Sequence, residues 1–196
     1  MWKVNEIFHS LQGEGYHTGT ASVFIRLSGC NLHCAFCDTQ HEAGTMMSLP
    51  EIVEQVMQYP QAQLIVLTGG EPSLWIDEDF VVGLKKMTGK RIAIETNGTH
   101  PLPHGIDWVT LSPKSGIGNS GDVPVVLTRC DELKVVYLGQ DLSQYDNIET
   151  SHRYLQPCWT DDADTRRRNL QATVQAVMDN PQGRLSLQTH RFLGIK

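Results

Sequence analysis

Residues 63–95 read QLIVLTGGEPSLWIDEDFVVGLKKMTGKRIAIE. The apolar run Gln63–Leu67 predicts a buried strand, the segment from Asp77 to about Met87 repeats apolar residues at helical spacing, and Arg91–Glu95 predicts a second strand. A strand, a helix and a strand in this order predict a βαβ unit whose two strands pair in parallel. This unit places the chain in the α/β class.

The same signals recur on both sides of this unit. Further strands are predicted at Lys3–Phe8, Ser22–Leu27, Trp108–Leu111, Glu132–Val136, Arg153–Leu155 and Arg184–Leu187. Ser48 and Glu51 have the spacing of a capping box and predict a helix that continues to about Tyr59. A longer helix is predicted at Asp161–Met178, with Leu170, Val174 and Val177 on its apolar face, and a weaker helical or irregular stretch at Asp141–Ile148.

About eight strands against three clear helices indicate that some crossovers have shrunk to loops, and a closed eight-unit barrel needs roughly 250 residues. The chain has 196 residues and no repeat or polar linker that would divide it. We therefore expect one domain over residues 1–196, an α/β fold with a partial, modified (β/α) barrel and a reduced helix count. Ligands are expected at the C-terminal ends of its strands.

Composition excludes some classes of partner. Lys and Arg total 16 against 22 Asp and Glu, for a net charge of −6, which gives no general attraction for nucleic acid or an anionic membrane. The sequence shows no run of ~20 apolar residues and no signal peptide at its start. The expected location is cytoplasmic, without nucleic-acid or membrane partners.

Three of the five cysteines crowd onto one loop after the strand Ser22–Leu27, as Cys30, Cys34 and Cys37. This C-x3-C-x2-C spacing can hold three irons of a 4Fe–4S cluster and leaves the fourth iron open to a chelating small molecule. The alternative is a non-catalytic zinc module, completed by His33, His41, Cys130 or Cys158. Structural zinc usually shows two paired ligand modules, and only one is present here, so the spacing favours iron–sulfur.

Motifs along nearly the whole chain resemble those of one enzyme family. Phe36, directly before the last cysteine of the triplet, is typical of radical S-adenosylmethionine (SAM) enzymes. Further landmarks follow in order at Phe8–Gly15, Cys37–Thr39, Thr68–Pro72, Glu95–Gly98, Ser112–Lys114 and Gln188–His190. Together these motifs resemble the 7-carboxy-7-deazaguanine synthases, and the resemblance implies a partial barrel of the radical SAM type.

The resemblance implies a carbon–nitrogen lyase that converts 6-carboxy-5,6,7,8-tetrahydropterin into 7-carboxy-7-deazaguanine with loss of ammonia, in the biosynthesis of queuosine and other 7-deazapurines. The implied cofactors are a 4Fe–4S cluster, SAM and Mg²⁺. The implied partners are the small pterin substrate, a second copy of the chain in a homodimer and a flavodoxin-like reductant. A glycyl-radical activase, which shares the cysteine spacing, is the alternative within the superfamily.

The resemblance also assigns residues to each ligand. Those for the cluster are Cys30, Cys34 and Cys37. Those for SAM are Phe36, Cys37, Asp38, Gly70, Glu71, Glu95, Ser112, Pro113, Lys114, Gln156 and Pro157. Those for the substrate are Leu11, Gln12, Gly13, Arg26, Thr68, His190 and Lys196, and the one for Mg²⁺ is Thr39.

The chemistry of several of these side chains suits the implied roles. The Gln12 amide and the neighbouring backbone offer the donors and acceptors that an amino-pyrimidine edge requires. The Arg26 guanidinium can hold a carboxylate through two parallel hydrogen bonds. The Thr39 hydroxyl is a hard oxygen ligand of the kind that Mg²⁺ takes in small number.

Overall fold

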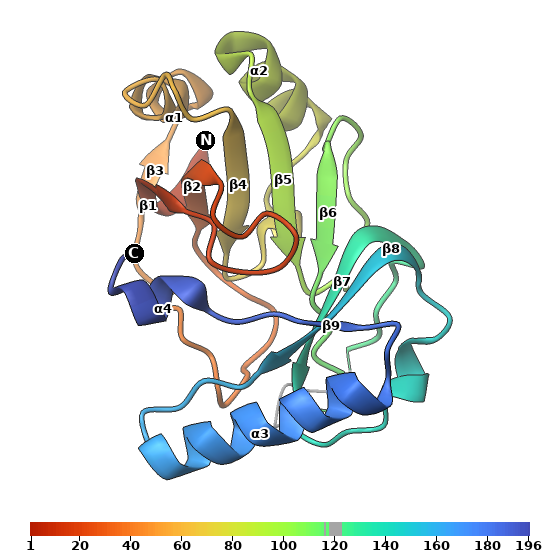
Figure 1. The fold of residues 1–196 in the computed structure, drawn as a ribbon. Coiled ribbons are helices and arrows are strands. Elements are labelled where there is room, and N and C mark those ends of the chain that lie inside the picture. Colours follow the sequence, from red (N-terminus) through yellow and green to blue (C-terminus); the bar gives the residue numbers. More distant parts are fainter. Residues whose placement is uncertain (116, 118–122) are drawn as a thin grey trace.

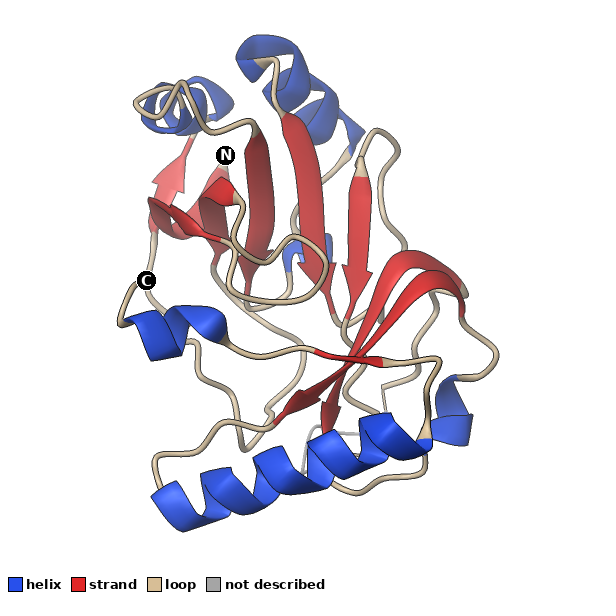
Figure 2. Cartoon of the chain, in the orientation of Figure 1, coloured by secondary structure: helices blue, strands red, loops and turns tan. Residues whose placement is uncertain are grey.

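The computed structural model describes residues 1–115, 117 and 123–196. Its centre is one curved sheet of nine strands in the order β3-β1-β2-β4-β5-β6-β7-β8-β9, with β3 and β9 at the two edges (Figures 1 and 2). The strands are β1 Trp2–Leu11, β2 Ala21–Leu27, β3 Thr45–Met47, β4 Leu64–Gly69, β5 Arg91–Thr96, β6 Trp108–Leu111, β7 Arg129–Tyr137, β8 Glu149–Pro157 and β9 Arg184–Leu185. The expected α/β partial barrel is confirmed.

The strand directions determine at which edge of the sheet ligands are expected to bind. From β2 to β9 every neighbouring pair is parallel, and β1 runs antiparallel to both β2 and β3. The carboxyl ends of the parallel strands therefore open at one edge of the sheet, where α/β folds bind ligands. The loop between β1 and β2 lies across the inner face of the sheet, since its residues contact side chains of β5, β6 and β7.

Four helices and two 3-10 turns cover this sheet (Figure 1). They are α1 Leu49–Val56, α2 Glu78–Thr88, α3 Ala163–Asp179 and α4 Thr189–Leu193, with η1 Pro72–Leu74 and η2 Leu142–Tyr145. The helices α1 and α2 pack on each other over the first strands, while α3 packs against β8 and β9. No helix in the described part of the chain is long and apolar enough to cross a membrane.

The helix ends follow the local signals in the sequence. Glu51 Oε2 accepts hydrogen bonds from the Ser48 backbone N–H and hydroxyl, each at 2.6 Å, and so closes the start of α1. Asp77 Oδ1 accepts from Phe80 N at 2.8 Å and begins α2. Gly89, with φ of +67°, ends α2 in the left-handed conformation that glycine adopts without strain.

Some sequence expectations were wrong. In α3, Val174 is 37% exposed, while Thr173 and Ala176 are buried against the sheet, so the buried face is shifted from the expected one. Thr173 is tolerated there because its hydroxyl donates to Asn169 O at 2.7 Å within the helix. The three-residue strand β3 was not expected, and the strand expected at Arg184–Leu187 shortens to β9.

Candidate functional site

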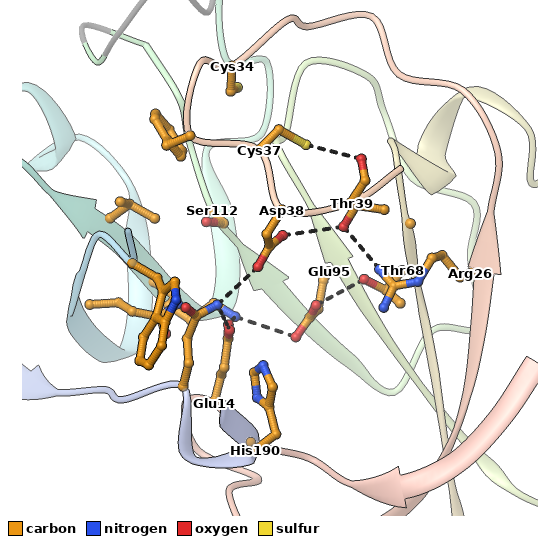
Figure 3. A pocket seen from close by; sticks show the side chains of 18 of the residues that line it. Glu14, Arg26, Cys34, Cys37, Asp38, Thr39, Thr68, Glu95, Ser112 and His190 are labelled. Carbon is orange, nitrogen blue, oxygen red and sulfur yellow. Dashed lines mark hydrogen bonds and ion pairs between the residues drawn. The ribbon is translucent and has the colours of Figure 1, made fainter. Parts of the chain in front are cut away.

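A cavity of about 480 Å³ opens at the C-terminal ends of the parallel strands (Figure 3). Every residue that the sequence assigned to the cluster, SAM, substrate or Mg²⁺ lines this cavity, with the exception of Pro113. Pro113 is buried in the turn after β6, directly beside Ser112, which does line it. The sequence motifs, spread from Leu11 to Lys196, therefore meet in one place.

The three clustered cysteines lie on the loop after β2 and line one part of the cavity. Cys30 and Cys34 are half-buried and Cys37 is exposed. Leu32 N donates to Cys30 Sγ at 3.4 Å, and burial raises the pKa of the Cys30 thiol.

These thiols do not form a site for a single ion. Within residues 1–115, 117 and 123–196, no three His, Cys, Asp or Glu side chains gather closely enough to hold one metal ion. Cys30, Cys34 and Cys37 nevertheless line the same cavity from one loop. A preformed zinc site completed by His33, His41, Cys130 or Cys158 is not seen among these residues.

The turn after β4 packs directly against the segment that leads into the cysteines. Gly70 N donates to Leu27 O at 3.1 Å, and Glu71 N donates to Gly29 O at 2.9 Å. A Cβ at Gly70 would lie 2.0 Å from Gly29 O and 3.0 Å from Cys30 N. Glycine is required here because the two backbones touch, and the contact fixes where the cysteine loop begins.

The carboxylate of Glu71, which the resemblance assigned to SAM binding, is occupied by neighbouring groups. It is buried and accepts hydrogen bonds from Ser73 N at 3.0 Å, Thr96 Oγ1 at 2.7 Å and Asn97 N at 2.6 Å. These bonds join the turn after β4 to the end of β5. Glu71 lines the cavity, but its carboxylate holds the cavity wall together.

Arg26 and Thr39, assigned to substrate and Mg²⁺, lie next to each other (Figure 3). Arg26 Nη1 donates to Thr39 Oγ1 at 3.1 Å, and its Nε donates to Glu6 Oε1 at 3.0 Å. The guanidinium also lies 5.7 Å from the centroid of the Phe8 ring. A cation and a hard hydroxyl oxygen therefore face the same part of the cavity.

On the opposite side, the residues after β6 and at the end of β8 contribute polar groups. Lys114 Nζ donates to both Ser112 O and Ser112 Oγ at 2.7 Å, and burial lowers the pKa of this lysine. Gln156 Oε1 accepts from Ser186 Oγ at 2.8 Å. Ser112, Lys114 and Gln156, which the resemblance assigned to SAM, line the same cavity as the cysteines.

The C-terminal segment, which includes the helix α4, lies against the cavity through His190, Arg191, Ile195 and Lys196. Arg191 Nη2 donates to Asp38 Oδ2 at 2.7 Å, and Thr189 N donates to Gly13 O at 2.9 Å. His190 packs so tightly on Gly13 that a Cβ there would lie 2.1 Å from the imidazole. At the chain end, Lys196 Nζ pairs with Glu6. The segment is thereby joined to both the cysteine loop and the β1–β2 loop.

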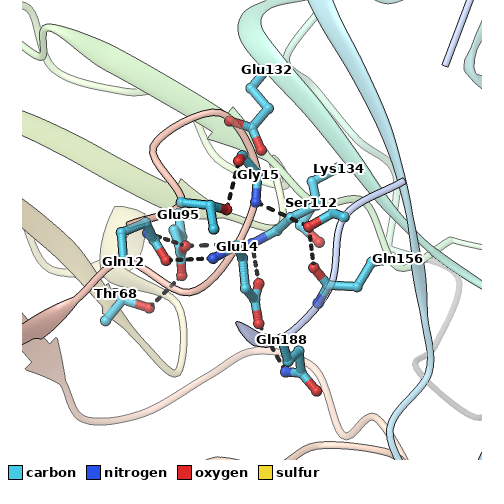
Figure 4. Close-up of polar contacts among 12 residues, drawn as sticks. Gln12, Glu14, Gly15, Thr68, Glu95, Ser112, Glu132, Lys134, Gln156 and Gln188 are labelled. Atoms are coloured by element: carbon cyan, nitrogen blue, oxygen red, sulfur yellow. Dashed lines mark hydrogen bonds and ion pairs between the residues drawn. The ribbon is translucent and has the colours of Figure 1, made fainter. Parts of the chain in front are cut away.

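Sequence reasoning missed a buried ionic group in the wall of the cavity, whose contacts are shown in Figure 4. Lys134 of β7 pairs with Glu14 and Glu95, and neither Lys134 nor Glu14 was assigned a role. One signal was available, because Glu132 and Lys134 place charges at alternating positions of a strand predicted to be buried. Trp159 and Arg191, which also line the cavity, had no comparable signal.

Comparison with known proteins agrees with this geometry. Residues 24–116 match the radical SAM superfamily. The chain is 56% identical to a 7-carboxy-7-deazaguanine synthase of Bacteroides thetaiotaomicron over the full length of both chains, and 37% identical to one of Bordetella pertussis over 99% of each. Its structure is similar to that of QueE from Escherichia coli, with a TM-score of 0.74 and 29% identity over 96% of this chain and 94% of that one.

Proposed function

The chain belongs to the family of 7-carboxy-7-deazaguanine synthases within the radical SAM superfamily, and from this membership we propose how its cavity works. It is a radical SAM enzyme that uses a 4Fe–4S cluster and SAM to convert 6-carboxy-5,6,7,8-tetrahydropterin into 7-carboxy-7-deazaguanine, with loss of ammonia. The observation that carries this conclusion is the meeting of all the family motifs in one cavity at the carboxyl ends of the strands.

Cys30, Cys34 and Cys37 would hold the cluster, because they are the three thiols that line the cavity from one loop. When bound, the cluster supplies the electron that cleaves SAM and so starts radical chemistry on the substrate. The chain's own contribution is geometric: the Gly70 contact fixes the cysteine loop, and the α4 segment limits access of water. The Ser112, Lys114 and Gln156 side chains supply polar contacts for SAM on the adjoining wall.

The substrate would lie between the β1–β2 loop and Arg26, away from the cysteines. Arg26 is suited to the substrate carboxylate, and Gln12 and Thr68 are suited to the edge of the pterin ring. We assign Thr39 as the protein ligand for Mg²⁺, since its hydroxyl lies 3.3 Å from Asp38 Oδ1 and both are hard oxygens. This would place the metal beside the substrate carboxylate.

Three further properties belong to the same proposal. A homodimer would cover one of the exposed edges of the open sheet at β3 or β9. A flavodoxin-like protein would supply electrons to the cluster. The chain would form a single domain, because one continuous sheet runs through it. Its location would be the cytoplasm, where cysteines remain as thiols.

The function is tested by anaerobic incubation of the iron-loaded protein with SAM, a reductant, Mg²⁺ and the carboxylated tetrahydropterin. We expect a product with the mass of 7-carboxy-7-deazaguanine that depends on both SAM and pterin. If the purified protein contained zinc and no iron, this result would instead support the non-catalytic zinc module. Cleavage of SAM without any pterin product, together with a glycyl radical on a protein substrate, would support the activase.

Replacing Arg26 with alanine is expected to raise the KM for the pterin about 10- to 100-fold, because two charge-assisted hydrogen bonds to the substrate carboxylate are lost. Iron content and SAM binding should stay at the level of the unaltered protein. The control is Arg129→Ala, which removes an exposed arginine paired with Glu149 at 3.9 Å outside the cavity. Equal KM values in Arg26→Ala and the unaltered protein would exclude Arg26 as the carboxylate anchor.

A further inference from the structure

A lysine side chain inside the cavity has no role in the proposed chemistry. Lys134 projects from the middle of β7, and its side chain is only 5% exposed. Lysine is rarely buried to this degree unless its ammonium is paired, because an unpaired charge loses its hydration. The contacts of Lys134 therefore indicate the role of its ammonium group.

Its partners are two carboxylates from different parts of the chain (Figure 4). Lys134 Nζ donates to Glu14 Oε2 in the β1–β2 loop and to Glu95 Oε1, at 3.4 Å, at the end of β5. One ammonium thus joins three segments that line the cavity.

Each carboxylate also accepts hydrogen bonds from other side chains. Glu95 Oε1 accepts from Gln12 Nε2 at 3.1 Å, and its Oε2 accepts from Thr68 Oγ1 at 3.0 Å. Glu14 Oε1 accepts from Gln188 Nε2 at 2.8 Å. Gln12 and Thr68 are residues assigned to the substrate, so the ionic group is continuous with the substrate side of the cavity.

The electrostatics explain why an ammonium is needed. Burial alone would lower the pKa of Lys134, but Glu14, Glu95 and Glu132 face it and hold its pKa above the usual range. Burial alone would raise the pKa of Glu14, but Lys134, Gln188 and His190 hold it below the usual range. Lys114 also faces this group. Lys134 lowers the pKa of Glu14 and also that of Glu132, whose pKa burial raises. Without this ammonium, each of these two carboxyls would keep its proton to a higher pH.

We propose that Lys134 is a positioning residue that holds the Glu14 and Glu95 carboxylates in place as hydrogen-bond acceptors for N–H groups of the substrate's pterin ring. The inference rests on the proposed function for the identity of the substrate. A reduced pterin carries amino and ring N–H groups, and a carboxylate accepts such donors strongly, whereas a protonated carboxyl presents an O–H to them. Lys134 itself acts only through the two carboxylates.

A second buried lysine provides a matched control. Lys90 is 3% exposed, and its Nζ donates to the backbone carbonyls of Tyr59, Pro60 and Ala62. It does not line the cavity and faces no carboxylate in these contacts. Lys90→Met therefore reports the general effect of removing a buried ammonium.

The experiment compares Lys134→Met, Lys134→Arg and Lys90→Met with the unaltered protein, each as the full chain reconstituted with its cluster. Equilibrium binding of the pterin in the presence of SAM, and KM and kcat, are measured from pH 6 to 9. Lys134→Met is expected to weaken pterin binding about tenfold or more at pH 7. The weakening should shrink as the pH rises, because the carboxylate that retained a proton then ionises. Lys134→Arg keeps the charge and should show the pH profile of the unaltered protein.

Iron content should be unchanged in both Lys134 variants. The inference is wrong if Lys134→Met binds pterin as the unaltered protein does, if its loss is independent of pH, or if Lys90→Met shows the same loss. Should Lys134→Met not fold, the double variant Lys134→Met/Glu14→Gln removes both charges of the pair. Its pterin binding should stay weaker than that of the unaltered protein at every pH, because both the ammonium and the Glu14 carboxylate are absent, and binding equal to that of the unaltered protein would contradict the inference. Failure of the unaltered protein to bind pterin contradicts the proposed function instead.

Discussion

Cys34→Ala is expected to remove both the iron–sulfur absorbance and all detectable cleavage of SAM. The three thiols come from one loop and line one cavity, and in the proposed function each would hold a separate iron. In this variant only two of the three cysteine ligands remain, and two ligands are too few to hold the cluster. The measurement is iron and sulfide content with the absorbance near ~400 nm after anaerobic reconstitution, followed by 5′-deoxyadenosine formation from SAM.

The matched control is Cys130→Ala. Cys130 is buried among the apolar side chains around β7 and does not line the cavity. Its replacement is expected to cost about 1 kcal/mol of unfolding free energy at most, and to leave cluster content unchanged. Cys34→Ala protein that retains a full cluster and cleaves SAM would refute the assignment of the cysteine loop.

Gly70→Ala is expected to have the second largest effect, although alanine is a small and common residue. A Cβ at this position would lie 2.0 Å from Gly29 O and 3.0 Å from Cys30 N, and both contacts are with backbone that cannot rotate away. The turn after β4 would have to separate from the cysteine loop, at a cost of about 1–3 kcal/mol or more. We expect a lower melting temperature and a cluster content well below that of the unaltered protein.

Gly183→Ala separates this steric effect from a general intolerance of substitution at glycine. A Cβ at Gly183 would lie 3.6 Å from Asn180 O, which is an ordinary contact distance. The expected change in unfolding free energy is within about 0.5 kcal/mol, with full cluster content. If Gly70→Ala matched Gly183→Ala in both readouts, close backbone packing would not explain the glycine at position 70.

Elements with strong local signals were predicted closely. The strand Trp108–Leu111 has the predicted bounds, and the helix predicted from Asp77 to about Met87 is α2, which buries Phe80, Val81 and Leu84. The elements that were missed are short. β3 has three residues and α4 has five, so neither spans enough periods for a pattern to emerge. The exposed Val174 of α3 shows the other source of error, since packing against β8 and β9 decides which face of a polar helix is buried.

The sequence by itself determined the family and the α/β class, and nearly every residue that its motifs assigned to a ligand does line the cavity. Only the tertiary structure decided which of them touch. Glu14 and Lys134 are 120 positions apart and form one ion pair inside the sheet, while the carboxylate of Glu71 is used by Ser73, Thr96 and Asn97 within the wall. The physical reason is that parallel pairing brings distant strand ends to one edge. Because the charged side chains at these strand ends are buried, each needs a partner of opposite charge, and only the folded chain supplies it.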